Sequence, residues 1–466
     1  MNPYATRRAA LIAQMQARGG GVAIIPTAPE VMRNRDADYP YRHDSYFYYL
    51  TGFTEPEAVL VLVAGEKNES ILFCREKNLE REIWDGFRYG PEAARTTFGV
   101  DAAHAIDAID AELPRLMANA PALYYALGSD AKLDAQVQRW LQSVRTQARA
   151  GVTPPAAAYD VQILLDDMRL KKDAAEIDLM QRSADIAAAA HRRAMRLARP
   201  GLREYHLEAE LLHEFRTSGA QFPAYTSIVA TGPNACVLHY RAGDAELKDG
   251  DLVLIDAGCE LDSYASDITR TFPANGRFSG PQKELYEIVL ASQYAAIDET
   301  RPGKRFMDGH DAAVRVLAQG MLDTGLLDAD KVGHLDDVIE SRAYSQFYMH
   351  RTGHWMGMDV HDCGSYIEPS EVGHTSERRD PLSGELILNR PSRILRPGML
   401  TTIEPGIYVR PGDGVPEAFH NIGIRIEDDA LITDGGCELL TRGVPVKADE
   451  IEALMRDGAP RPADLA

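Results

Sequence analysis

The chain has 466 residues, of which 45% are hydrophobic and 26% are charged, an ordinary composition for a globular protein of two or three domains. The 50 basic and 70 acidic residues give a formal net charge of −20, which argues against a nucleic-acid partner and against docking on an anionic membrane. The 5 cysteines are scattered without a CxxC pair, as is typical of a reducing compartment. No apolar run is long enough for a signal peptide or a membrane span, so we expect a cytoplasmic protein.

Helix and strand signals alternate in the first third of the chain. Apolar runs predict strands at residues 22–25, 58–64, 70–74 and 122–126, and helical patterns cover residues 4–18, 101–119 and 131–149. The Pro-rich segment 151–160 is a candidate break, and a charged helix is predicted over 173–198. We therefore expect an N-terminal α/β domain over residues 1–172 and a second domain over residues 173–466.

Two acidic residues stand where a strand pair normally buries apolar side chains. The apolar run 252–255 and the Thr-rich run 265–272 predict two strands of a hairpin. Asp256 and Asp267 then face each other, and no Lys or Arg of the hairpin shares their face. A divalent cation between them is one explanation, and a polar, solvated hairpin is the other.

Further chemistry-bearing residues follow in the second half. His350, His354 and His361 lie within 12 residues of one another among glycines, too many imidazoles for ordinary core packing. Glu404 interrupts a strand-like run just before Pro405, a common position for a metal ligand.

The run 422–433 predicts a strand whose alternation places Arg425 and Glu427 on one face. If the segment is considered alone, an ion pair between these two residues and a functional role for them are equally open.

A count of charges indicates the number of metal ions. Four carboxylates and one imidazole form the candidate set, namely Asp256, Asp267, Glu404, Glu427 and His354. One divalent ion would leave two negative charges in excess, whereas two ions would neutralise the four carboxylates. Oxygen ligands with a single imidazole suit Mn²⁺, which Co²⁺ or Zn²⁺ could replace.

The motifs DGDLVLIDAG, SDITRTF, HWMGMDVHD, TIEPGIY and GIRIEDD, in this order, resemble the pita-bread metallopeptidases, and within them the bacterial Xaa-Pro aminopeptidase (aminopeptidase P) family. YFYYLTGFTEPEAVLVL and REIWDGFRYG extend the resemblance into the first half. It implies a creatinase-like α/β N-terminal domain. It also implies an α+β pita-bread catalytic domain, in which helices cover a curved antiparallel sheet with two metal ions at its centre.

The resemblance also implies an activity, the hydrolysis of the peptide bond between an N-terminal residue and a penultimate proline. A hydroxide that bridges two divalent ions, Mn²⁺ by preference, would be the nucleophile. The implied metal ligands are Asp256, Asp267, His354, Glu404 and Glu427.

Roles for other residues follow from the same resemblance. Glu404 would carry the proton, and His361 and His239 would stabilise the tetrahedral intermediate. The implied substrate-side residues are His350, Tyr408, Arg425 and Trp84. Trp84 would reach the active site of a neighbouring subunit, so we expect a homodimer or homotetramer.

An insertion of about residues 367–391 departs from the family pattern and could cap the active site or be a surface loop. Arg378, Arg379 and Arg390 in this insertion could capture a proline carboxylate, which keeps a prolidase that cleaves Xaa-Pro dipeptides open as an alternative. Creatinase and the non-catalytic, peptide-binding pita-bread modules are weaker alternatives, because all five implied ligands are present.

Overall fold

The computed structural model describes residues 2–457. It divides into two compact units at Met168 and Arg169, within helix α7 (Gln162–Leu170). The sequence analysis set this boundary at residue 172. The two units are described separately below.

The N-terminal unit is built on one mixed sheet with the strand order β4-β3-β2-β1-β5-β6. Its strands are β1 (Gly21–Pro26), β2 (Val59–Ala64), β3 (Glu69–Cys74), β4 (Ala102–Ala105), β5 (Ala122–Tyr125) and β6 (Ala157–Asp160). Its helices before α7 are α1 (Pro3–Gln16), α2 (Ser45–Thr51), α3 (Leu79–Asp85), α4 (Gly90–Phe98), α5 (Ile109–Met117) and α6 (Ala131–Arg145).

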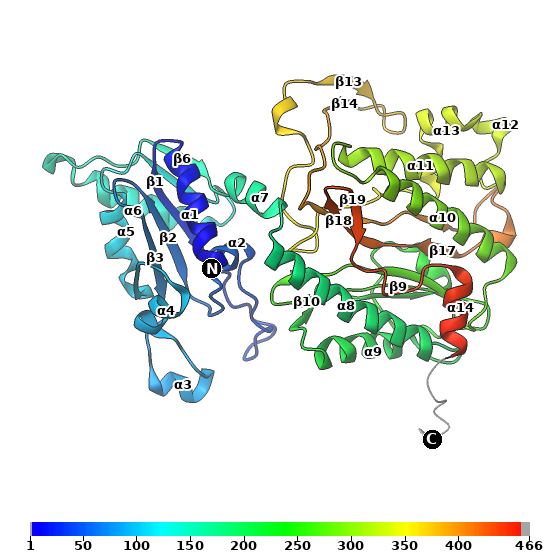
Figure 1. Ribbon diagram of the computed structural model, residues 1–466, viewed down its shortest axis with the longest axis horizontal. Coiled ribbons are helices and arrows are strands. Elements are labelled where there is room, and N and C mark those ends of the chain that lie inside the picture. Colours follow the sequence, from blue (N-terminus) through cyan, green and yellow to red (C-terminus); the bar gives the residue numbers. More distant parts are fainter. Residues whose placement is uncertain (1, 458–466) are drawn as a thin grey trace. The chain divides into compact units, whose positions relative to one another are not determined.

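Helices α5 and α6 bury Leu113 and Trp140 against Val22 and Ile24 of β1 on one face of this sheet (Figure 1). Helix α1 contacts β2, and helix α2 contacts both β1 and β2. Because successive residues of a strand point to opposite faces, the uninterrupted apolar run of β1 indicates a strand covered on both sides.

Two predictions for this unit are wrong. Residues 102–105 form strand β4 beside β3, whereas a helix was predicted from residue 101. The Pro-rich segment 151–160 is no domain break, because residues 157–160 return to the sheet as β6 and pair with β5. In both cases, pairing with a distant strand overrides the local signal.

The C-terminal unit is antiparallel throughout its named strand pairs. Its strands are β7 (Phe222–Pro223), β8 (Ile228–Thr231), β9 (Leu252–Asp256), β10 (Cys259–Leu261), β11 (Tyr264–Ala265), β12 (Thr269–Pro273), β13 (Ser376–Arg379), β14 (Leu386–Asn389), β15 (Leu400–Ile403), β16 (Gly406–Val409), β17 (Ile422–Arg425), β18 (Asp428–Thr433) and β19 (Gly436–Leu439). Its helices after α7 are α8 (Ala174–Leu197), α9 (Glu204–Thr217), α10 (Gly280–Glu299), α11 (Phe306–Asp323), α12 (Ala329–Val332), α13 (Leu335–Ser341) and α14 (Ala448–Arg456).

Strands β9 and β17 run through the middle of this unit, with α8 and α9 on one side and α10 and α11 on the other (Figure 1). One large apolar core joins these layers. Phe215 of α9, Val289 of α10 and Leu317 of α11 are fully buried in it together with Ile255 of β9 and Ile424 of β17. The helices thus fix the position of the central strands. Asp256 is the last residue of β9, and Glu427 follows the end of β17 by two residues.

The insertion folds as a hairpin. Strands β13 and β14 pair with Arg378 opposite Ile387, and the hairpin lies near α11 and α13 at the top of Figure 1. The segment is therefore structured, and the polar, turn-rich sequence places most of its residues in contact with solvent.

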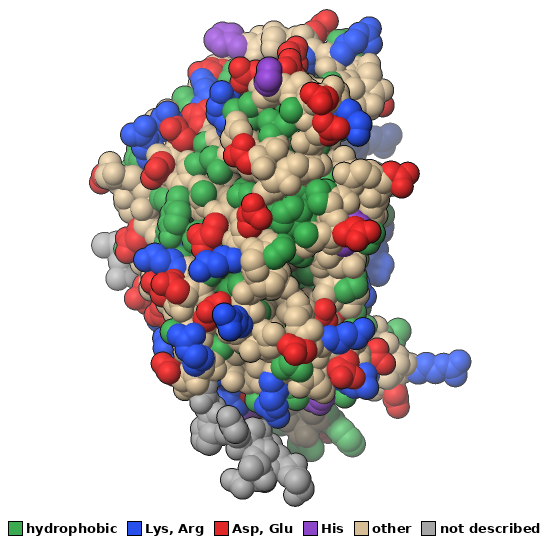
Figure 2. Space-filling view, turned by 90° about the vertical axis from the view of Figure 1, so that its right-hand side faces the viewer, with side chains coloured by type: hydrophobic (Ala, Val, Ile, Leu, Met, Phe, Trp, Pro, Cys, Tyr) green, Lys and Arg blue, Asp and Glu red, His purple; other side chains and the backbone are tan. Residues whose placement is uncertain are grey.

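On the face that Figure 2 shows, acidic and basic side chains are interspersed, with hydrophobic side chains scattered among them. None of the helices within residues 2–457 has both the length and the apolar character that a membrane span requires.

Candidate metal centre

Strands β9 and β12 bring Asp256 and Asp267 together. The strands are antiparallel as predicted, with Asp256 opposite Thr269, and Asp267 lies just before β12. The hydroxyl of Tyr225 is 2.5 Å from Oδ1 of Asp256 and also bonds Oδ1 of Asp267. Because a phenol has one proton to donate, it leaves this pair of carboxylates with an excess of negative charge.

Glu404 and Glu427 lie at two adjacent breaks in the sheet. β15 pairs with β18 and β16 pairs with β17, so the chain crosses between the two pairs at residues 404–405 and again at 426–427. The amide of Ile426 donates to the carbonyl of Pro405 over 3.3 Å, which places the two breaks side by side. The continuous strand predicted over residues 422–433 is therefore wrong: it is interrupted where Glu427 stands.

His354 is held against β15 by its own backbone. The amide of Thr402 donates to the carbonyl of His354 over 2.9 Å, and the amide of His354 donates to Oγ1 of Thr402 over 3.1 Å. A Cβ atom on Gly353 would lie 2.0 Å from the carbonyl oxygen of Thr402, so only glycine permits this approach. Nδ1 of His354 lies 3.0 Å from the carbonyl of Trp355. This contact places the proton on Nδ1 and leaves Nε2 free to bind a cation.

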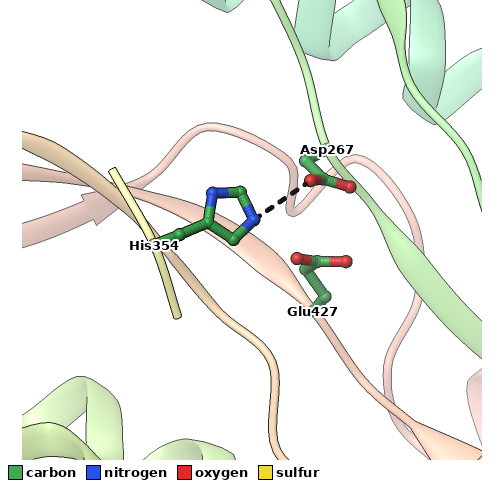
Figure 3. A group of neighbouring side chains, drawn as sticks. All are labelled: Asp267, His354 and Glu427. Carbon is green, nitrogen blue, oxygen red and sulfur yellow. Dashed lines mark ion pairs between the residues drawn. The ribbon is translucent and has the colours of Figure 1, made fainter. Parts of the chain in front are cut away.

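Ligand atoms from Asp267, His354 and Glu427 all lie within 4.8 Å of one another (Figure 3). Nε2 of His354 is 3.5 Å from Oδ2 of Asp267 and 3.8 Å from Oε1 of Glu404. These separations are too long for hydrogen bonds and suit side chains that converge on a common cation.

Burial makes this cluster electrostatically unfavourable without a cation. Burial, and then the charge of Asp256, raise the pKa of Asp267 well above its ordinary value. Burial, and then Asp267, do the same to the pKa of Glu427. Burial, and then Glu427, raise the pKa of Glu404 to about 8. One cation, Arg425, faces these carboxylates, and its Nη2 donates to Asp256 over 2.6 Å. The donor set therefore fits divalent metal ions, which supply the missing positive charge.

A cavity of about 630 Å³ opens over these residues. All five predicted ligands line it, and so do four more predicted site residues, His239, His350, His361 and Arg425. The structure thus brings nine of the predicted site residues to one cavity. The described lining extends as far as Tyr366 on the side of the insertion.

His361 and His239 are solvent-exposed groups on the cavity wall. The ring of His361 lies 4.1 Å from the ring of His354, and burial, followed by the charge of His354, lowers the pKa of His361 to about 4. His361 is therefore neutral at pH 7 and retains one N–H to donate. Asp362, which follows it, accepts hydrogen bonds from the buried Arg169 and Lys172 over 2.6 and 3.0 Å, and these bonds fix the backbone there.

Tyr408 lies beneath the cavity. It is 1% exposed, and Nη1 of Arg425 donates to its hydroxyl over 2.9 Å. The hydroxyl lies 2.8 Å from Nε2 of His350, to which it donates. The predicted pair of Arg425 with Glu427 is replaced by the pair of Arg425 with Asp256, because β17 ends at Arg425 and the chain turns before Glu427.

The sequence analysis missed Tyr225, which joins Asp256 to Asp267. It lies between β7 and β8 in a segment without a recognisable motif, and only the fold brings it to the β9–β12 pair. It also missed Thr269, whose hydroxyl donates to Oε2 of Glu427 over 2.6 Å. Residues two apart in a strand point to the same face, so the sequence already indicated that Thr269 lies on the face of Asp267, near the predicted metal ligands.

Trp84 lies in α3 of the N-terminal unit with 82% of its surface exposed, beside Ile83 at 81%. It does not line the cavity, and the nine predicted site residues that do line it all belong to the C-terminal unit.

Comparisons with known proteins agree with this geometry. The model of metallopeptidase family M24 matches residues 178–434, and the model of the aminopeptidase P N-terminal domain matches residues 4–124. The chain belongs to metallopeptidase family M24 and carries the aminopeptidase P N-terminal domain before its catalytic domain.

Relatives match the chain almost from end to end. The chain is 44% identical to the Xaa-Pro aminopeptidase of Escherichia coli, with 97% of each sequence covered. The structure of Pseudomonas aeruginosa aminopeptidase PepP superposes with a TM-score of 0.89 at 50% identity, covering 97% of both chains. Zinc-substituted E. coli aminopeptidase P in complex with product gives a TM-score of 0.90 at 43% identity, covering 98% of this chain and 99% of that one. The predicted resemblance and fold class are confirmed, and the protein is a metallopeptidase.

Proposed function

We propose that the protein is an aminopeptidase that hydrolyses the bond between an N-terminal residue and a penultimate proline. The observation that carries this proposal is the convergence of four carboxylates and one imidazole on a single cavity. This site lies in a chain that is 44% identical to an Xaa-Pro aminopeptidase over 97% of its length.

Asp256, Asp267, His354, Glu404 and Glu427 would hold two divalent metal ions, with Mn²⁺ preferred because four of the five ligands are carboxylates. Four carboxylates and Arg425 carry three negative charges in total, which two divalent ions and one hydroxide balance. Bound ions would supply a bridging hydroxide as the nucleophile and would polarise the scissile carbonyl.

The chain's own groups would handle the proton and the developing charge. Glu404 faces the cavity with 18% of its side chain exposed, so it can take a proton from water and pass it to the leaving nitrogen. His361 and His239 stand on the cavity wall and would donate hydrogen bonds to the oxygen that becomes negative in the tetrahedral intermediate.

The remaining residues would position the substrate. His350 lines the cavity and would pack beside the proline ring. Tyr408 holds His350 in place, and Arg425 holds both Tyr408 and Asp256. Tyr408 is thus a positioning residue in this proposal and makes no direct contact with substrate. Trp84, exposed in α3, would complete the site of a neighbouring subunit in a homodimer or homotetramer, which sedimentation tests.

The position of the arginines favours an aminopeptidase over a prolidase. Nη1 of Arg379 donates to the carbonyl of Gly384 over 3.1 Å, and Arg378 and Arg390 line a different cavity. None of these three closes the metal-centre cavity just beyond the proline, as a prolidase requires.

The test compares kcat/KM of the Mn²⁺-loaded enzyme for an Xaa-Pro dipeptide, an Xaa-Pro-Xaa tripeptide and a proline-free control. The proposal expects cleavage of the tripeptide after its first residue and no cleavage of the control. Cleavage confined to the dipeptide would establish the prolidase alternative. Absence of any cleavage would support a non-catalytic peptide-binding module.

Cytoplasmic location remains a prediction, supported by five free thiols.

A further inference from the structure

A second cavity lies directly beside the metal-centre cavity. It has a volume of about 1040 Å³, and His350, Arg351 and Tyr366 line both cavities. A single layer of side chains therefore separates the space over the metal ligands from this second space.

The insertion forms one wall of the second cavity. Arg378 from β13 and residues 387–390 from β14 and its end face Phe306 and Val314 of α11 across it. Helix α13 and the turn after it contribute Ile339 and Arg342. The hairpin and α11 lie close together in Figure 1. The segment that departs from the family pattern thus builds a compartment next to the active site.

This compartment is rich in positive charge. The guanidinium groups that line it belong to Arg315, Arg342, Arg351, Arg378 and Arg390, and one carboxylate, that of Asp311, accompanies them. Such a surplus stands out in a chain with a formal net charge of −20.

Three of these arginines form no direct ion pair within residues 2–457, although the charge of Arg378 does act on the carboxyl of Asp311, whose pKa it lowers against the larger effect of burial. Arg315 pairs with Asp336 at 3.1 Å and Arg342 pairs with Asp380 at 2.7 Å. Among residues 2–457, no ion pair involves Arg351, Arg378 or Arg390. Like charges gathered in a cavity repel one another, so an arrangement of this kind favours the binding of an anion.

The pKa of the neighbouring His310 is also affected by these arginines. Nδ1 of His310 bonds the hydroxyl of Thr352 over 2.9 Å. Burial lowers the pKa of His310 to about 4, and Arg351 and Arg342 add to this effect. Within the hairpin, Arg378 faces the cavity, whereas the adjacent Arg379 turns to the carbonyl of Gly384. The two arginines therefore provide a matched pair for experiment.

We propose that this cavity is a subsite for a carboxylate on the downstream side of the scissile bond. The inference rests on the proposed aminopeptidase function and names a substrate preference for it. Arg351, on the wall shared with the metal centre, and Arg378, on the hairpin, bind the carboxylate through their planar guanidinium forks. The carboxylate is either the C-terminus of a short peptide or the side chain of Asp or Glu. Short free-acid peptides and acidic peptides are thus the preferred substrates.

The experiment measures kcat/KM for matched peptides with the Mn²⁺-loaded enzyme. Ala-Pro-Ala-Ala is compared as the free acid and as the C-terminal amide, and a series one to three residues longer locates the best position of the carboxylate. Amidated peptides with Glu or Gln at that position separate the side-chain source from the terminal one. We expect a preference of about tenfold or more for the charged member of a pair, weaker at high salt.

Variants locate the origin of this preference. Arg378→Gln and Arg351→Gln should reduce the ratio of kcat/KM between the charged and the neutral peptide towards one, and Arg379→Gln should keep it. Because the ratio is taken within each variant, losses of folded enzyme or of metal cancel.

Two results would overturn the inference while the proposed function stands. One is equal cleavage of charged and neutral peptides by the wild type at every length. The other is a preference that persists in both Arg378→Gln and Arg351→Gln. If the metal-loaded enzyme cleaves no Xaa-Pro peptide, the proposed function fails, and this inference fails with it.

Discussion

Glu404 should make the metal-free protein less stable as the pH rises. Burial and the nearby Glu427 raise its pKa in the folded protein to about 8, against 4.5 for an unperturbed carboxyl. Between these two values, the unfolded chain releases a proton that the folded protein keeps. Stability therefore falls as the pH rises from about 4.5 to about 8, and below about 4.5 both states are protonated and the penalty is absent.

The magnitude follows from this difference. One pKa unit corresponds to about 1.4 kcal/mol, so the step from 4.5 to about 8 amounts to about 5 kcal/mol, most of it between pH 5 and pH 8. This is an upper value, because 18% of the side chain is exposed to the cavity and water there screens the charge. Glu404→Gln keeps the size of the side chain and removes its titration, so the variant should lack this penalty.

The assay is thermal unfolding of chelator-treated protein, followed by circular dichroism at pH 5 and pH 8. A unit of about 300 residues has an unfolding entropy of about 0.6 kcal/mol/K, so going from pH 5 to pH 8 the wild type should lose up to about 8 °C more in Tm than Glu404→Gln does. Replacement of the exposed Glu417 by Gln serves as the control and should behave as the wild type. An equal loss of Tm in wild type and Glu404→Gln would refute the argument that Glu404 is buried among like charges.

Three further predictions concern the metal centre. Chelation should abolish hydrolysis and Mn²⁺ should restore it, whereas Asp267→Ala should stay inactive; full activity in protein that elemental analysis shows to be metal-free would exclude a metal mechanism. His361→Ala should retain its metal and lose about 10²- to 10³-fold in kcat, and an unchanged kcat would remove His361 from the mechanism. Tyr225→Phe should bind Mn²⁺ about tenfold more weakly in competition with a chelator, because its hydroxyl holds Asp256 and Asp267 together; an unchanged affinity would contradict this role.

The sequence by itself determined the features that depend on local pattern. Alternation along residues 265–272 predicted the pairing that brings Asp256 and Asp267 together, and that pairing is present. A carboxylate directly before Pro405 marked the end of a strand, because proline cannot continue the hydrogen-bond ladder. Motif order then added the family, which a local pattern cannot supply.

Tertiary structure alone decided the partners that lie far apart in the chain. Tyr225 is 31 residues from Asp256, and Arg425 is 169 residues from the same carboxylate. That Arg378 and residues of α11 line one cavity likewise depends on the folded chain. Hydrophobic periodicity reports which face of an element is buried, but not which distant side chain meets it there. Strand pairing and helix packing determine which distant side chains come into contact. At this site they therefore determine the net charge that bound metal ions would balance.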